Sequence, residues 1–262
     1  MQYTCDMSLQ PSSTAHHVWT VAAITCVAFT ISDMSHEGLG HGVVAYIMGA
    51  KHLTLTTTYL NCDIDNKWII AAGTVVNLIE GVIALALLRL GGFAAHLRFF
   101  LWILATVSLF DGTGYFLFSS VFNFGDWAMV IKGIPHAFAV RMAMGAVGLI
   151  LYTLSMRVVA GEIAVFAERL ETVTWVPYAV TVLVNCLAAA FNPLGVMLLL
   201  VSALPASAGA NAGLFNLAGW ARGLRSSEGT LAVTPHRGWM IAGALTAAIF
   251  IGVFGHGVTL NR

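Results

Sequence analysis

Apolar residues dominate six long stretches of the chain, which are separated by short polar segments. A helix needs about 20 mostly apolar residues to cross a bilayer. The predicted membrane helices cover residues 18–48, 68–90, 97–121, 137–159, 176–204 and 239–260. Asn192-Pro193 interrupts the fifth and marks a kink or a substrate gate. We therefore expect an all-α membrane protein with about six transmembrane helices.

The polar connections carry further structural signals. Residues 51–60 are rich in β-branched side chains in alternation, which predicts a short β-strand or hairpin between the first two helices. An extended peptide could pair with an open edge of such a strand. Residues 157–171 are predicted to extend the fourth helix beyond the membrane. Residues 206–237, rich in Gly, Ala and Ser, form the largest predicted polar connection.

Composition agrees with a membrane protein. Hydrophobic residues make up 58% of the 262 residues and charged residues only 9%, whereas about a quarter of an ordinary soluble domain is charged. The net charge is zero and there is no basic tract, which argues against a nucleic-acid partner. The four cysteines, Cys5, Cys26, Cys62 and Cys186, form no C-x-x-C pair and are predicted to be buried thiols. The first apolar run lacks the features of a cleaved signal peptide and is expected to be retained.

Cationic residues give a weak orientation signal. With six helices and the N-terminus outside, the inner flanks hold Lys51, Lys67, Lys132, Arg141, Arg222, Arg225 and Arg237. The outer flanks then hold Arg89, Arg98, Arg157, Arg169 and Arg262. This excess on the inner side favours an N-terminus outside under the positive-inside rule.

The most informative run is residues 36–41, His-Glu-Gly-Leu-Gly-His, inside the first predicted helix. Ionisable groups at membrane depth are costly and usually functional. Two neutral imidazoles and a carboxylate are the groups with which zinc hydrolases bind the metal and activate water. Residues five apart in an α-helix lie about 140° apart in azimuth, so His36 and His41 could share an ion only through a π-bulge. Gly38 and Gly40 make such a distortion easier.

Residues 36–41 resemble the H-E-x-x-G-H zincin variant of the dipeptidyl-peptidase III family. Their surroundings resemble the site-2 protease class of intramembrane metalloproteases. The order over residues 32–115 is the His-Glu helix, the strand-like segment, the small-residue and Asn motif at residues 72–77, and Asp111-Gly112. The chain departs from that class by the extra residue in the motif and by Thr74 where Pro is usual. It also lacks the Asn and Pro that usually precede Leu-Asp-Gly, so the resemblance is to a divergent member.

The resemblance implies a Zn²⁺ cofactor held by His36, His41 and Asp111, with Glu37 as the general base. Asn77 would hydrogen-bond the developing oxyanion or orient the substrate. The expected partners are a membrane protein or peptide substrate and the lipid bilayer; the sequence does not indicate an oligomeric state. The whole chain is expected to be a single polytopic domain, with the metalloprotease core in about 18–127 and C-terminal helices in 137–262.

Alternatives stay open at several positions. Glu80, one turn after Asn77, could be the third ligand in place of Asp111. Asp126 could reach the metal if the chain turns back, but the favoured interpretation is a helix cap. Asp33 could orient a histidine or line a water path.

The function predicted from these residues is a membrane zinc metalloprotease that hydrolyses peptide bonds. A transporter or ion-pathway protein is one alternative, because ionisable groups on several helices and a broken helix also suit a conduction path. A non-catalytic relative that binds a membrane partner is the other.

Overall fold

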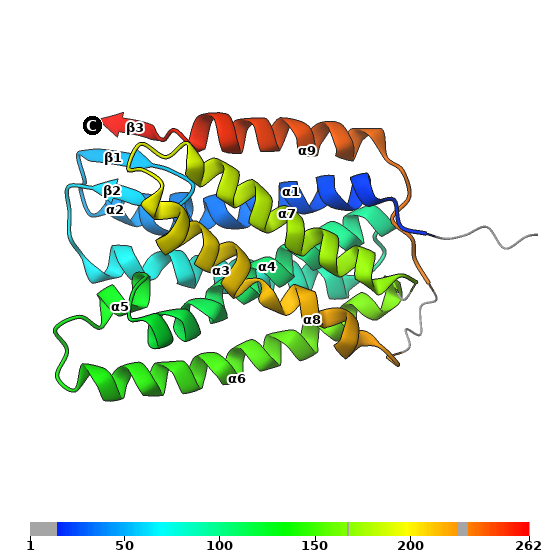
Figure 1. Ribbon diagram of the computed structural model, residues 1–262, viewed down its shortest axis with the longest axis horizontal. Helices are drawn as coiled ribbons and strands as arrows, with labels where there is room; N and C mark the ends of the chain where they lie inside the picture. The colour runs from blue at the N-terminus through cyan, green and yellow to red at the C-terminus, as the bar shows by residue number, and fades with distance from the viewer. Residues whose placement is uncertain (1–14, 167, 225–229, 262) are drawn as a thin grey trace, which may run out of the picture.

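The computed structural model describes residues 15–166, 168–224 and 230–261. It is an elongated bundle of helices with a small sheet at one end, which we call the sheet end (Figure 1). Among the described residues, six helices are long and apolar enough to cross a membrane. The predicted all-α membrane fold is therefore confirmed, and the helices are compatible with a multi-pass membrane protein.

The first crossing is continuous from Val18 to Ile47 but changes its winding on the way. It consists of α1 (Val18–Met34), a π-helical segment η1 (Ser35–Gly42) and α2 (Val43–Ile47). The next long helices are α3 (Lys67–Leu90), α4 (Ala95–Phe122), α6 (Ala137–Ile163) and α7 (Leu170–Ala190). A short helix, α5 (Asp126–Val130), lies between α4 and α6, and a 3₁₀ turn, η2 (Ala164–Phe166), extends α6. The last crossing is α9 (Arg237–Ile249) followed by η5 (Phe250–Phe254).

The predicted hairpin is present and gains a third strand. Strands β1 (His52–Leu55) and β2 (Leu60–Cys62) pair antiparallel, with Leu53 opposite Cys62. Strand β3 (Val258–Asn261), from the end of the chain, pairs antiparallel with the other edge of β1. The sheet order is β2-β1-β3, so β2 is an edge strand. The prediction that the last helix reaches residue 260 is wrong, because its end is a strand.

Residues 199–221 correct the predicted topology. The fifth helix ends at Ala190 rather than at residue 204. The chain then turns at the sheet end and crosses the bundle again through η3 (Leu199–Ala203), η4 (Pro205–Ala210) and α8 (Ala212–Ala221), antiparallel to α7 (Figure 1). Much of the predicted polar connection is thus a broken helical crossing. Its small residues allow close packing, since Leu214 and Leu217 are fully buried.

The extra crossing changes the orientation argument. Figure 1 places the start of α1 and the end of α8 at the same end of the bundle, and β3 at the other. Arg222 and Arg237, which flank the connection after α8, therefore lie at the end where α1 begins. The cationic balance predicted from six crossings no longer holds, and which end faces outside stays untested. Arg225, Arg262 and Cys5 lie outside the described residues.

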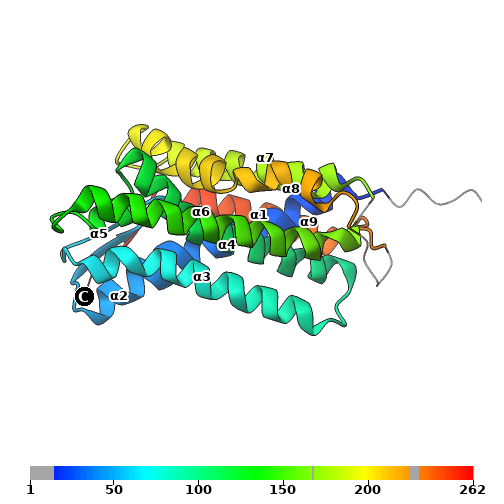
Figure 2. The same cartoon turned by 90° about the horizontal axis from the view of Figure 1, so that it is seen from below.

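Helix α4 occupies the centre of the bundle. It runs behind α6 in Figure 2 and packs against α1, α3 and α6. Its aromatic side chains Phe99, Trp102 and Phe110 are almost completely buried. By contrast, α9 and the outer face of α3 expose large apolar side chains such as Ile83 and Ile241. This exposure suits a surface that meets lipid.

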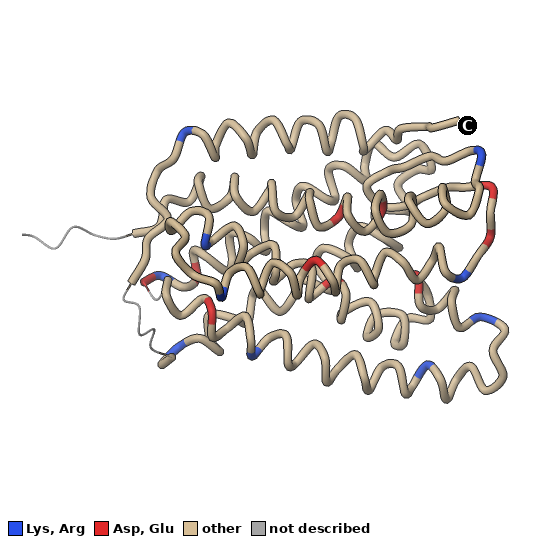
Figure 3. The backbone as a smooth tube through the Cα atoms, turned by 180° about the vertical axis from the view of Figure 1, so that it is seen from behind, with Lys and Arg blue, Asp and Glu red and all other residues tan. Residues whose placement is uncertain are grey.

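Charged residues follow the opposite pattern. Lysines and arginines gather toward the two ends of the bundle, whereas several acidic residues lie near its middle (Figure 3). His36, Glu37 and Asp111 are each less than 10% exposed, since their relative exposures are 5%, 6% and 6%. The interior is therefore polar at the level of the predicted motif.

Of the cysteines predicted to be buried, Cys26 is buried, whereas Cys62 and Cys186 are half-buried.

Candidate metal centre

The π-helical segment η1 brings the two histidines of the motif together. In a π-helix, backbone hydrogen bonds run between residues five apart, so such residues lie on nearly the same face. The amide of Val43 donates to the carbonyl of Gly38 in this pattern. The ring centroids of His36 and His41 are consequently 4.7 Å apart. The predicted distortion is present, and it spans the whole run Ser35–Gly42 rather than one bulged residue.

Fixed hydrogen bonds orient both imidazoles. His36 Nδ1 lies 3.0 Å from Oδ1 of Asn77, and His41 Nδ1 lies 2.7 Å from the carbonyl oxygen of Ile69. These oxygens accept, so each Nδ1 carries the proton and donates. In the neutral imidazoles, Nε2 of each ring then carries no proton, and its lone pair is available to bind a metal. Such hydrogen bonds on the far nitrogen are typical of metal-bound histidines.

Asp126 completes a group of three potential ligands. Its Oδ2 lies 3.2 Å from Nε2 of His36 and 3.4 Å from Nε2 of His41. One donor atom from each residue lies within 4.8 Å of the others, so the group could hold a metal ion. Burial raises the pKa of the Asp126 carboxyl, but the two imidazoles, when they carry a proton in place of a metal, outweigh this effect and leave the pKa well below its usual value. The carboxylate is therefore ionised, as a ligand must be.

The favoured interpretation of Asp126 as a helix cap is wrong. Helix α5 begins at Asp126, but its N-cap is Gly125 and no side chain caps it. Gly125 has φ = 85°, which lets the chain turn back after α4. That turn brings the Asp126 carboxylate next to Nε2 of His36 and of His41. The sequence analysis left open that Asp126 reaches the metal because the chain turns back, but no local sequence signal distinguished that arrangement from a helix cap.

The floor of the cluster is the backbone of Gly73. A β-carbon added at Gly73 would lie 2.5 Å from Nε2 of His36 and 2.6 Å from Nε2 of His41. A β-carbon added at Gly40 would lie 2.5 Å from the Cα of Gly73. Close approach of η1 to α3 therefore requires both glycines. The space that a methyl group would fill at Gly73 is the space between the two donor nitrogens.

Other predicted site residues lie around the cluster rather than in it. Asp111 is not one of the three grouped ligands, and its Oδ1 accepts a hydrogen bond from Asn211 at 3.0 Å. Asn77 is committed to His36 and to Ser32. Glu80 accepts from Ser35 and Ser108. Asp33 is also outside the ligand group, and its Oδ2 has no hydrogen-bond partner among the described residues.

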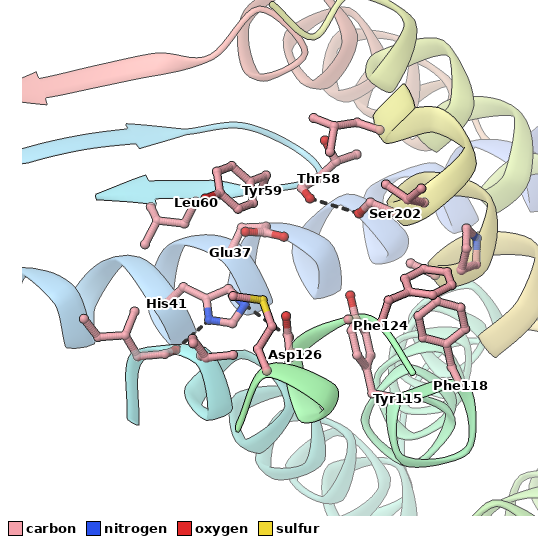
Figure 4. Close-up of a pocket in the computed structure, with 18 of the residues that line it drawn as sticks. Glu37, His41, Thr58, Tyr59, Leu60, Tyr115, Phe118, Phe124, Asp126 and Ser202 are labelled. Carbon is pink, nitrogen blue, oxygen red and sulfur yellow. Dashed lines mark hydrogen bonds and ion pairs between the residues drawn. The ribbon is translucent and has the colours of Figure 1, made fainter. Parts of the chain in front are cut away.

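A cavity of about 690 Å³ opens beside the cluster. Glu37, His41, Tyr115 and Asp126 face it, together with strand β2 (Figure 4). Its remaining walls are mostly apolar and come from α3, α4, α5 and the broken crossing η3–η4; they include Ile70, Phe118, Phe124, Met129 and Val201. The Ser202 hydroxyl donates to the Thr58 carbonyl at 2.9 Å and ties the broken crossing to the hairpin. The arrangement can therefore present an apolar chain to a polar centre.

Asn192 anchors the turn between α7 and the broken crossing. Its side chain donates to the hydroxyl of Thr58 at 3.0 Å and accepts from the amide of Leu194 at 2.9 Å. The predicted break at Asn192-Pro193 is therefore a well-bonded turn beside the hairpin. It fixes the broken crossing above the cavity.

Comparisons with known proteins give no family. No protein-family model matches the chain, and no match is found among curated proteins or among solved structures. The functional argument therefore rests on the site itself.

Gly73→Ala tests the location of the metal. Because the added methyl group would occupy the space between the two Nε2 atoms, we expect metal binding to be lost. Gly81→Ala is the matched control: it lies on the same helix, and its β-carbon would lie 2.7 Å from Cγ of Leu109, away from the histidines. Metal content of purified protein, measured by elemental analysis, should fall only for Gly73→Ala. Equal metal content in both variants would contradict this location.

Paired substitutions of Asp126 and Asp111 identify the third ligand. Asp126→Asn should remove the metal, because the carboxylate adjoins both histidines. Asp111→Asn should retain near-stoichiometric metal, since Asp111 lies outside the cluster. Metal titration by calorimetry measures both. The reverse pattern would restore Asp111 as the ligand expected from the sequence resemblance.

Proposed function

We propose that this protein is a membrane-embedded zinc-dependent peptidase. The observation that carries the proposal is the convergence of His36, His41 and Asp126 beside Glu37, at the wall of an apolar cavity. Two imidazoles and one carboxylate leave the fourth position of a tetrahedral ion open, as catalytic zinc sites do. The fold thus supplies both a ligand set and access to it.

The spacing of the donor atoms supports zinc. Bonds of about 2.0–2.1 Å at a tetrahedral angle separate neighbouring donors by about 3.3 Å. Asp126 Oδ2 lies 3.2 Å from Nε2 of His36 and 3.4 Å from Nε2 of His41. Three acceptor atoms at these distances would also repel one another without a shared cation or protons between them. A zinc ion relieves that repulsion.

Glu37 is the proposed general base. When bound, zinc would acidify a coordinated water and polarise the scissile carbonyl. Glu37 adjoins His36 in the sequence, faces the cavity, and has a buried Oε2 with no hydrogen-bond partner. That free oxygen can accept the proton of the attacking water and pass it to the leaving amine.

Tyr115 is the proposed stabiliser of the oxyanion. Its ring stacks on His36 with centroids 5.0 Å apart and planes inclined by 24°. Figure 4 shows its hydroxyl directed into the space that Glu37 and Asp126 also face. A phenol there can donate to negative charge that develops on a carbonyl oxygen. The role predicted for Asn77 suits it less, because Asn77 already bonds His36 and Ser32 and does not line the cavity.

The edge of β2 indicates the form of the substrate. Among the described residues, no strand pairs with the outer side of β2, and Thr58, Leu60 and Cys62 line the cavity. An extended peptide could pair with this edge and place a carbonyl near the cluster. The apolar walls favour apolar side chains on that peptide. The proposed substrate is therefore an extended segment of a membrane protein.

Glu37→Gln tests the peptidase chemistry. The variant should keep its zinc, but its turnover rate should fall about 10²–10⁴-fold because the proton acceptor is gone. Cleavage of fluorogenic apolar peptides in proteoliposomes provides the rate, and elemental analysis the metal content. Glu171→Gln, at an exposed carboxylate paired with Arg222 far from the cavity, is the control and should be unaffected. Undiminished cleavage by Glu37→Gln would exclude Glu37 as the base.

Tyr115→Phe separates stabilisation of the oxyanion from binding. It removes one hydroxyl and keeps the ring stacked on His36. We expect kcat to fall about 10²–10³-fold with KM nearly unchanged, because the hydrogen bond from the Tyr115 hydroxyl strengthens only as charge develops on the carbonyl oxygen. Steady-state kinetics on the same peptides measures the split. An increase in KM alone would instead assign Tyr115 to substrate binding.

A transport function is the second candidate, and the broken crossing η3–η4 favours it. Discontinuous helices near the middle of a membrane protein often form ion or substrate sites. Metal-dependent flux through proteoliposomes without peptide cleavage would select this candidate over the peptidase.

A further inference from the structure

A second, smaller chamber adjoins the large cavity, with which it shares Glu37, Thr58, Tyr115, Ser202 and Ala206. It has a volume of about 10 Å³, which is room for about one water-sized sphere. Asp33, Asp111, Thr57 and Asn185 line it together with Glu37. These residues come from α1, η1, α4, the hairpin turn and α7, so the chamber is at the junction of five parts of the fold. His36 also lines it, but the polar atoms without a partner at the chamber are all oxygens.

Several oxygens at the chamber have no hydrogen-bond partner. In the part of the chain that the structure describes, they are Oδ2 of Asp33, Oγ1 of Thr57 and Oδ1 of Asn185, each inaccessible to solvent. Thr57 and Asn185 are both only 1% exposed. The Asn185 amide nitrogen already donates to the Ala203 carbonyl at 3.3 Å, so its oxygen is left as an acceptor. Buried polar atoms are normally satisfied, and an unsatisfied group costs about 1–3 kcal/mol.

The chamber also has an excess of acceptors, and Asp33, Glu37 and Asp111 bring three carboxyl groups to it, each negative when ionised. No lysine or arginine is among the described residues that line the chamber. One water molecule has two protons to donate and could not satisfy all of these oxygens. A cation would satisfy several acceptors at once and offset the charge.

We propose that this chamber is a binding site for a single dehydrated sodium ion. All-oxygen donors favour a hard cation rather than zinc. Mg²⁺ usually keeps several waters and Ca²⁺ needs six to eight oxygens, and the chamber has no space for those waters. Sodium sites beside broken membrane helices use the same kind of donors, and η3–η4 contributes Ser202 and Ala206 to the wall. The proposal does not depend on peptidase activity.

Sodium-dependent thermal stability of the full-length protein in detergent is the direct test. Unfolding is followed in sodium chloride and in choline chloride at equal ionic strength, with and without bound zinc. We expect the unfolding temperature to rise saturably with sodium and not with choline, in both zinc states, because a ligand that binds only the folded state stabilises it. Equal responses to the two salts would overturn the proposal.

Two variants localise the site. Asp33→Asn removes one charged ligand and should raise the half-saturating sodium concentration about tenfold or abolish the response. Thr57→Val removes an unpartnered hydroxyl and should weaken sodium binding, because that hydroxyl is one of the proposed ligands. Glu171→Gln removes a distant charge and should respond like the wild type. Wild-type sodium responses in both chamber variants would place the ion elsewhere and refute the site. If Asp33→Asn does not fold, the response of Thr57→Val alone decides whether the chamber binds sodium.

The zinc content of the same variants separates the two sites. Asp33→Asn and Thr57→Val should keep the metal held by the histidine cluster, since neither residue belongs to it. A sodium response that survives removal of zinc supports an independent chamber even if no peptide is cleaved. Loss of the sodium response whenever zinc is removed would contradict an independent site.

Discussion

Two imidazoles five residues apart can share an ion only if their helix makes a wider turn. The π-helical run Ser35–Gly42 supplies that turn, and every other feature of the centre follows from it. With α-helical winding, His41 would face away from His36 by about 140°. The wider turn is accommodated because Gly40 and Gly73 let η1 and α3 come into backbone contact. The contact places Asn77 and Ile69 of α3 where they can orient the two imidazoles.

The same contact limits what can surround the centre. Because α3 forms its floor, the third ligand and the substrate must come from other sides. The turn at Gly125 brings Asp126 to one side, and the hairpin with the broken crossing forms the cavity on another. Hydrogen bonds from Ser202 and Asn192 to Thr58 hold these two walls together. The hairpin is in turn paired with β3, so the last residues of the sheet support the site.

The sequence predicted the features that depend on local patterns. Apolar stretches located the membrane helices, the β-branched run located the hairpin, and two residue types at an unusual spacing indicated the π-helix. It failed where distant segments decide the outcome. Asp126 meets the histidines only because the chain reverses at Gly125, and β3 pairs with β1 from about 200 positions away, since Val258 lies opposite Leu55. Residues 199–221 were missed as a crossing because Pro205, Gly and Ser weaken the hydropathy of a segment that protein largely covers.

Glu37 lines two adjoining polar compartments of different chemistry. At one, two nitrogens and a carboxylate adjoin a wide apolar cavity; at the other, a chamber of about 10 Å³, the polar atoms without a partner are all oxygens. Softer donors and an open position suit a metal that exchanges ligands during a reaction, whereas a closed oxygen shell suits an ion that stays. Charge explains why both compartments occur together. Asp33, Glu37, Asp111 and Asp126 place four carboxyl groups in the interior, and the two histidines form their ion pairs with Asp126. The remaining negative charge requires protons or a cation at Asp33 and Asp111, since an uncompensated carboxylate is costly to bury.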